Sequence, residues 1–310
     1  MQNSPVFVCG ALRSGSTMLH LMLDGHPNID NAGEFDFLFD LLGDKGEPPI
    51  KEEFIEWLRS NRIFQSQNLI VDNSLSVYEL INSFVQQIKH KDNILALNVH
   101  RNFHRIPFVF PDAKYIHLIR DPRDVAKSCV AMGWAGNVYY GVDHWVNTED
   151  SWQALSIGLD RQKYFTVRYE DLVVNAEEEL TRICQFFHLP YSPAMLSYNE
   201  DSTYSKPDAT LIEQWRDKLT LNEIKQVESK AKGLMGISSY NLSGGEAKLP
   251  SMPERLKLKV YNIIYKNIFS IKRYGVYLYL NEKAARKLGF KKKHTNALLQ
   301  CNEIDKRYLK

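Results

Sequence analysis

Short apolar runs alternate with amphipathic stretches over most of the chain, and this alternation predicts strands and helices in turn. Four runs predict buried strands: 6–8, a run ending at His100, 115–119 and a run ending near Tyr169. Apolar residues at helical spacing predict helices over 18–23, 51–60, 76–91, 176–189 and 219–236, and Gly233 and Gly236 read as stop signals for the last of these. The order predicts an α/β fold of three layers, with a central parallel sheet flanked by helices.

A polar loop between the first strand and the first helix has the composition of an anion site. It reads Gly10-Ala11-Leu12-Arg13-Ser14-Gly15-Ser16-Thr17. The backbone N–H groups of such a loop, together with the positive end of the helix, attract a phosphate or sulfate group. Arg13 adds a fixed positive charge. The alternative is a glycine-rich turn that only joins the strand to the helix.

The two glycines of this loop have P-loop spacing, but the lysine of a Walker A sequence is missing. Ser16 stands at the position directly after the second glycine, where that lysine would be. The lysine normally reaches the β- and γ-phosphates of a triphosphate. Its absence disfavours an ATP-dependent enzyme, although a P-loop small-molecule kinase remains an alternative.

A second candidate anion site follows the third predicted strand. Arg120 stands directly after this strand, Asp121 can cap the next helix, and Pro122 suits its first position. Ser128 lies two turns into that helix. A guanidinium group and a hydroxyl group together offer several donors to a phosphate. The alternative is a surface pair of Arg120 with an aspartate, beside an ordinary helical serine.

The two motifs, in this order, resemble those of sulfotransferases that use 3′-phosphoadenosine 5′-phosphosulfate (PAPS). In that family an Arg-Ser-Gly-Thr-Thr loop holds the 5′-phosphosulfate, and the matching residues here are Arg13, Ser14, Gly15, Ser16 and Thr17. A strand-end arginine and a serine eight residues later hold the 3′-phosphate, and Arg120 and Ser128 match them. The resemblance runs from about Val6 to about Tyr240 and is closest to the bacterial and tyrosylprotein branches. It implies a P-loop-type fold, PAPS as the sulfuryl donor and no required metal.

Later stretches that resemble landmarks of the family add residues to the expected nucleotide site. Tyr169 lies in the sequence VRYEDLV at the end of a predicted strand. The segment from Asp201, with Ser205 and Lys206, resembles the family's mobile segment over the nucleotide. For Lys206 the alternative is a solvated loop charge. Trp215 is expected to pack rather than to bind.

Two residues compete as the base that takes the acceptor proton. Glu34 lies in the Gly-Glu element that supplies a catalytic glutamate in the bacterial and tyrosylprotein branches, so the resemblance favours it. His100 lies near the position of the catalytic histidine in the cytosolic branch, and imidazole titrates near neutral pH. The alternatives are a surface carboxylate and a hydrogen-bonded strand-end histidine. Arg13 is a third catalytic candidate, because pre-placed donors stabilise charge on the transferred group.

The cysteines and the N-terminal segment indicate the cellular compartment in which the protein is expected. Cys9, Cys129, Cys184 and Cys301 are far apart and form no Cys-x-x-Cys pair, so neither a disulfide framework nor a zinc site is expected. The N-terminal segment has no basic region before its short apolar run, and no stretch approaches the length of a membrane span. We therefore expect a cytoplasmic protein.

Charge is distributed unevenly along the 310 residues. Residues 1–250 contain 24 Lys and Arg against 33 Asp and Glu, whereas residues 251–310 contain 15 against 4. We therefore expect a sulfotransferase domain over 1–245 and a basic helical extension over 246–310. The extension is expected either to pack on the domain or on a second subunit, or to contact a membrane surface. No nucleic-acid-binding motif accompanies its charge.

Together these patterns predict an enzyme that moves a sulfuryl group from PAPS to a hydroxyl, or less favourably an amine. The transfer would be in line and assisted by a general base. The acceptor is a small molecule, a carbohydrate, a lipid-linked molecule or a peptide. The alternatives are the P-loop kinase and a nucleotide-binding module without turnover, although such a module has no need of Glu34 or His100.

Overall fold

A parallel sheet forms the centre of the protein. The structure is a computed structural model that describes residues 4–90, 92–198, 206–244 and 247–308. Within these residues the sheet has five strands in the order β2-β3-β1-β4-β5, and all neighbouring pairs are parallel. The strands are β1 (Val6–Gly10), β2 (Ile29–Glu34), β3 (Ile94–Val99), β4 (Lys114–Ile119) and β5 (Tyr164–Arg168). The predicted α/β class is confirmed.

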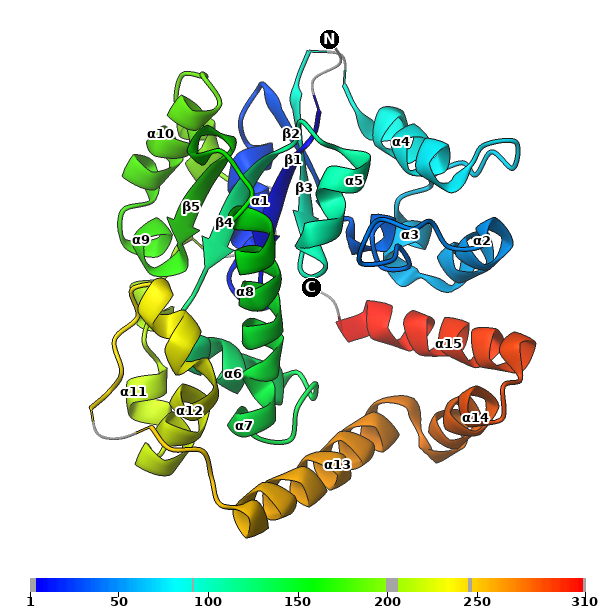
Figure 1. The fold of residues 1–310 in the computed structure, drawn as a ribbon, viewed down its shortest axis with the longest axis vertical. Helices are drawn as coiled ribbons and strands as arrows, with labels where there is room; N and C mark the ends of the chain where they lie inside the picture. The colour runs from blue at the N-terminus through cyan, green and yellow to red at the C-terminus, as the bar shows by residue number, and fades with distance from the viewer. Residues whose placement is uncertain (1–3, 91, 199–205, 245–246, 309–310) are drawn as a thin grey trace.

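Helices cover both faces of the sheet (Figure 1). Phe7 and Cys9 of β1 pack into a cluster with α2 (Lys51–Ser60), α4 (Val77–Ile88) and α8 (Asp143–Ser156). The alternate residues Val6 and Val8 pack into a second cluster with α1 (Ser16–Asp24) and α10 (Ala176–Phe186). Because both faces of β1 are buried, its sequence is a continuous apolar run. The three predicted layers are therefore present.

Several shorter elements complete the body of the molecule. The remaining α-helices are α3 (Arg62–Ser66), α5 (Ile106–Val109), α6 (Pro122–Ala131), α7 (Val138–Gly141), α9 (Tyr169–Val174), α11 (Trp215–Lys218) and α12 (Leu221–Ile237). The 3₁₀ turns are η1 (Asp36–Leu38), η2 (Phe103–Arg105), η3 (Arg161–Lys163), η4 (Pro193–Leu196) and η5 (Ala209–Leu211). A third apolar cluster joins α6, α7, α8 and α12.

β2 is a strand that the apolar pattern does not indicate. Its sequence, Ile-Asp-Asn-Ala-Gly-Glu, contains one large apolar residue, Ile29. The strand lies at the edge of the sheet, and a hydrogen bond of 3.3 Å from Asn31 Nδ2 to Asn98 Oδ1 joins it to β3. Edge strands often carry charged residues, which discourage pairing with a further strand. The pairing of β2 with β3 places Glu34 at the carboxyl edge of the sheet.

Two helix ends test the predicted boundaries. The Asp121 side chain accepts a hydrogen bond from Arg123 N, and Pro122 is the first residue of α6, as predicted. The prediction that Gly233 stops α12 is wrong, because the helix continues through it to Ile237. It ends where Ser239 adopts a positive φ of 59°. An isolated glycine weakens a helix without ending it when the surrounding face is buried.

The C-terminal extension consists of α13 (Met252–Tyr274), α14 (Val276–Lys287), α15 (Lys291–Asp305) and the turn η6 (Lys306–Tyr308). Figure 1 shows α13 crossing one end of the molecule, with α14 and α15 returning toward α2. Gly136 N donates to Asn262 Oδ1 at 2.6 Å, and Asn302 Nδ2 donates to Ser60 O at 3.0 Å. The extension thus contacts the body at two separate places. None of the described helices combines the length and apolar character needed to cross a bilayer.

Candidate functional site

The loop between β1 and α1 turns sharply at the carboxyl edge of the sheet. Arg13 and Gly15 have positive φ angles of 72° and 92°. Gly15 occupies the N-cap of α1 without a capping side chain, so the first N–H groups of the helix remain available to an anion. A Cβ atom at Gly15 would lie 2.3 Å from Tyr169 Cδ2. The Tyr169 ring therefore closes directly over the loop.

The two candidate anion sites meet at Arg13. Its Nε donates to Ser128 Oγ at 2.9 Å, which joins the loop to α6. Arg120 donates from Nη1 to the Arg13 carbonyl at 3.2 Å and from Nη2 to the Leu211 carbonyl at 2.8 Å. The Arg120 guanidinium also lies 4.1 Å from the centre of the Tyr169 ring. Side chains more than a hundred residues apart thus form one cationic cluster.

Two donors of this cluster are buried without a protein partner among the described residues. They are Ser14 Oγ and Arg120 Nε. A buried donor that lacks a partner costs roughly 1–3 kcal/mol, and an oxyanion bound in the loop would supply acceptors. Ser16 and Thr17 form the first turn of α1, and Thr17 is exposed. The cluster therefore has the donor set that a phosphate or sulfate group needs.

Asp124, in the first turn of α6, is the nearest carboxylate to Arg120. Its Oδ2 lies 3.8 Å from Arg120 Nη2, and its Oδ1 accepts a hydrogen bond of 2.9 Å from Trp215 N. Burial raises the pKa of Asp124 to about 6, although Arg120 acts in the opposite direction. The negative charge of Asp124 is thus disfavoured where it would compete with a bound anion for Arg120.

Glu34 and His100 lie side by side, because β2 and β3 are neighbours in the sheet. The distance from His100 Nε2 to Glu34 Oε1 is 3.7 Å. The His100 side chain is 2% exposed, whereas that of Glu34 is 41% exposed. The two rival bases therefore form one pair, of which Glu34 is the open member.

The ring of His100 is held by the first residue of the loop. His100 Nδ1 lies 2.8 Å from the Gly10 carbonyl oxygen. A carbonyl only accepts hydrogen bonds, so Nδ1 carries a proton and Nε2 is the nitrogen that faces Glu34. The pair is thereby connected to the anion-binding loop through Gly10.

Asp36 is a member of this group that the sequence pattern did not single out. It lies in η1 and is 7% exposed, and its Oδ1 accepts a hydrogen bond of 2.7 Å from His100 N. Arg101 Nη1 lies 3.6 Å from the same oxygen. Arg101 also forms an ion pair with Asp40, with 2.6 Å between Nη2 and Oδ2. The one available signal was an aspartate within the aromatic run Phe35–Phe39.

The pKa shifts follow from these contacts. The neighbouring His100 lowers the pKa of Glu34 from its usual 4.5, in spite of partial burial. Burial alone would lower the pKa of His100 from its usual 6.5, but Glu34, Asp36 and the Gly10 carbonyl raise it further than burial lowers it. Burial raises the pKa of Asp36. The contacts thus favour the ionised forms of both members of the pair.

The predicted segment over the nucleotide is only partly described. Ser205 lies outside the described residues. Lys206 is exposed, and within the described part of the chain it makes no hydrogen bond or ion pair. The side chain of Trp215 packs as expected, because the residue is 3% exposed and the Arg123 guanidinium lies 3.6 Å from its ring centre. The assignment of Ser205 and Lys206 to the nucleotide site stays a prediction.

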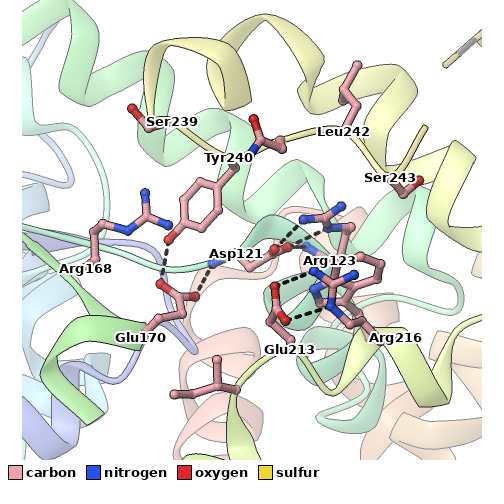
Figure 2. Close-up of a pocket in the computed structure, with 13 residues that line it drawn as sticks. Asp121, Arg123, Arg168, Glu170, Glu213, Arg216, Ser239, Tyr240, Leu242 and Ser243 are labelled. Atoms are coloured by element: carbon pink, nitrogen blue, oxygen red, sulfur yellow. Dashed lines mark hydrogen bonds and ion pairs between the residues drawn. The ribbon is translucent and has the colours of Figure 1, made fainter. Parts of the chain in front are cut away.

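A cavity of about 360 Å³ lies next to Asp121 and Glu170 (Figure 2). Three arginines line it, but each has a carboxylate near it. Arg123 contacts Asp121 at 2.6 Å, Arg216 contacts Glu213 at 2.7 Å, and Arg168 lies 3.7 Å from Asp171. With its arginines compensated in this way, the cavity is a poorer anion site than the cluster at Arg13.

The sequence that forms the sheet and the site matches the model of a known family. The model of a sulfotransferase family matches residues 5–193, more than half of the chain. The chain therefore belongs to the sulfotransferase family.

Relatives of two kinds share part of the sequence. The chain is 24% identical to the protein-tyrosine sulfotransferase of Drosophila melanogaster over 213 residues, which cover 63% of this chain and 40% of that protein. It is 28% identical to a putative protein-tyrosine sulfotransferase of Caenorhabditis briggsae, covering 63% of this chain and 69% of the relative. An omega-hydroxy-beta-dihydromenaquinone-9 sulfotransferase of Mycobacterium tuberculosis is 30% identical over 140 residues, which cover 38% of this chain and 36% of that protein. The chain thus spans only about two fifths of the length of the Drosophila enzyme.

A solved structure confirms the fold. The sulfotransferase domain from the curacin biosynthetic pathway superposes with a TM-score of 0.58 at 22% identity, covering 77% of this chain and 98% of that domain. The predicted P-loop-type α/β architecture is therefore that of the family.

Proposed function

We propose that this protein transfers a sulfuryl group from PAPS to the hydroxyl group of an acceptor. One observation carries the proposal: a P-loop without the Walker lysine, joined to Arg120 and Ser128, lies next to the Glu34–His100 pair at the same edge of the sheet. An anion site and a base side by side are what a sulfuryl transfer requires. Family membership and the tyrosine and menaquinone sulfotransferases among its relatives support the same activity.

The cationic cluster is proposed to bind the nucleotide at its two anionic ends. The loop N–H groups, Ser14 and Arg13 would hold the 5′-phosphosulfate, whose sulfuryl group is the group transferred. Arg120 and Ser128 would hold the 3′-phosphate, with Tyr169 packed beside Arg120. The buried, unpartnered Ser14 Oγ and Arg120 Nε fit this role, because an oxyanion supplies the acceptors they lack.

Glu34 is proposed as the base, with His100 as its positioning partner. The Glu34 side chain is exposed to an arriving acceptor, whereas His100 is nearly fully buried. The Gly10 carbonyl fixes the His100 ring, so that Nε2 faces the Glu34 carboxylate at 3.7 Å and attracts it when the ring is protonated. The carboxylate would take the acceptor proton as the acceptor oxygen bonds to sulfur. The bond from sulfur to the bridging phosphate oxygen would break, and 3′-phosphoadenosine 5′-phosphate would leave. Arg13 is proposed to stabilise charge on the transferred group.

The division of the chain and its compartment are proposed on separate grounds. We propose that residues 1–245 form the catalytic domain and residues 246–310 a basic extension, because every described residue assigned to the site precedes the extension. Cys9, Cys129, Cys184 and Cys301 are all buried free thiols, which supports a cytoplasmic location.

Thermal shifts with two nucleotides test the proposed function. We expect 3′-phosphoadenosine 5′-phosphate (PAP) to raise the melting temperature, and ATP with magnesium to raise it less. Arg120→Ala should weaken PAP binding roughly 10- to 100-fold, the loss of a charge-assisted contact. Arg161→Ala is the matched control, because among the described residues Arg161 bonds only to its neighbour Tyr164. Stabilisation by ATP alone, or an unchanged PAP affinity in Arg120→Ala, would refute the assignment.

A further inference from the structure

The helix α13 presents an apolar stripe to solvent. None of its 23 residues is buried. Leu256, Val260, Ile263 and Ile264 recur at the spacing of one helix face, and their exposed fractions are 62%, 48%, 49% and 51%. A contiguous apolar face that stays open on a folded protein marks a surface of interaction.

The opposite face of α13 holds the helix to the body. Asn262 accepts a hydrogen bond of 2.6 Å from Gly136 N, and Tyr265 OH donates to the Val130 carbonyl at 3.3 Å. Phe269 packs on Gly133 so closely that a Cβ atom there would lie 2.2 Å from the ring. These contacts fix which face of α13 turns outward, at the end of the molecule seen in Figure 1.

Lysines border the apolar stripe. By the helical period, Lys259 and Lys266 lie on one flank of the stripe, and Lys257 lies on the other. All three are exposed, and within the described residues none pairs with a carboxylate. The helix contains a single acidic residue, Glu254, which is occupied in the N-terminal capping box. The exposed side of α13 is therefore apolar in the middle and cationic at both margins.

We propose that this face of α13 binds the surface of an anionic membrane, with the helix axis in the membrane plane. An apolar stripe flanked by lysines suits such a surface, since the apolar residues enter the headgroup boundary and the ammonium groups meet lipid phosphates. The lysines that border the stripe are complementary in charge to anionic lipid.

A second copy of the chain fits this face less well. Pairing of two α13 stripes would bring lysines opposite lysines, and like charges across an interface disfavour binding.

Co-sedimentation of the full-length protein with lipid vesicles tests the proposal. The probes are vesicles of phosphatidylcholine alone and vesicles in which about a third of the lipid is phosphatidylglycerol. We expect the protein to sediment with the anionic vesicles and not with the neutral ones. Binding should fall severalfold between low and high salt, because salt screens the attraction of the lysines.

Two double variants separate the contribution of the lysines from that of the apolar stripe. Lys259→Gln with Lys266→Gln should weaken partitioning roughly tenfold or more. Val260→Gln with Ile263→Gln should weaken it by a similar factor. The matched control is Lys225→Gln with Lys232→Gln, which removes the same charge from exposed positions on α12 and should leave partitioning near wild type. The thermal shift with PAP checks that each variant is folded.

Three results would overturn the proposal. The first is equal binding to neutral and anionic vesicles. The second is wild-type partitioning in both α13 variants. The third is a dimer by light scattering that Val260→Gln with Ile263→Gln converts to a monomer, together with no vesicle binding, which would assign the face to a second copy. None of these readouts depends on sulfuryl transfer.

Discussion

Glu34 and His100 are shifted in opposite directions, and each shift sets the pH range in which the residue can act as a base. A base must be unprotonated. The pKa of Glu34 lies below 4.5, so its carboxylate is ionised throughout the neutral range. The pKa of His100 lies above 6.5, so its ring becomes unprotonated only at higher pH. The acidic limb of the pH–rate profile therefore distinguishes the two residues.

Glu34→Gln keeps the size of the side chain but cannot accept the acceptor proton. We expect turnover to fall by roughly 10²–10⁴ while PAP affinity stays near wild type. In the wild-type enzyme, turnover should persist to lower pH than an ordinary glutamate would allow, because the neighbouring His100 lowers the pKa of Glu34. Steady-state kinetics across the pH range, together with PAP titrations, measure both effects.

His100→Asn is the companion variant. As a positioning residue, His100 should affect turnover less than Glu34 does. The acidic limb should move to higher pH in His100→Asn, because His100 is the main group that lowers the pKa of Glu34. An acidic limb above pH 6.5 in the wild type, lost activity in His100→Asn and full activity in Glu34→Gln would exchange the two roles.

Among the elements, the apolar pattern predicted the strands that carry several apolar residues, including the partly buried edge strand β5. β1, β3 and β4 are buried on both faces and appear as continuous apolar runs in the sequence, and the anion loop follows from β1 and its glycines. β2 was not predicted, because its mostly polar residues form neither an apolar run nor an alternation of apolar and polar positions. With β2 unseen, the sequence placed Glu34 near the site but could not show that it pairs with His100. The left-handed backbone conformation of Arg13 could not be predicted either, because an arginine in the sequence does not indicate a positive φ.

The conformation of the β1–α1 loop depends on Gly15, and a substitution there can be compared with one at a control glycine. Gly15→Ala would add a methyl group against the Tyr169 ring at a φ of 92°. We expect a loss of roughly 1–3 kcal/mol of stability and a smaller thermal shift with PAP, because the loop and Tyr169 must move apart.

Gly233→Ala is the control for this substitution. Gly233 lies inside α12, and a Cβ atom there meets nothing within 4 Å. Alanine should therefore raise stability by roughly 0.5–1 kcal/mol and leave the PAP shift unchanged. Equal effects of the two substitutions would show that the loop carries no special constraint at Gly15.

Across the whole molecule, the site is assembled from contacts that no local pattern encodes. Arg13 reaches Ser128 and the Arg120 side chain reaches the Arg13 carbonyl, across 115 and 107 residues. The sequence could name these residues because their motifs resemble those of a family. It could not show that the two anion sites touch, since that depends on β1 and β4 being neighbours in the sheet. The same holds for the extension, whose charge was visible but whose outward face is fixed by the contacts of α13 with the body.

A chain that ends at Pro250 tests whether the extension is separate from the nucleotide site. We expect the PAP-dependent thermal shift to remain, because the described residues assigned to the nucleotide site precede residue 250. Stability should fall by about 2–4 kcal/mol, since the truncation removes Asn262 from Gly136 N and the Phe269 ring from Gly133. Asn262→Ala in the full chain is the milder companion, with an expected cost of about 1 kcal/mol. If Asn262→Ala, or a folded truncated chain, lost the PAP shift, the extension would belong to the nucleotide site and the proposed division of the chain would be wrong.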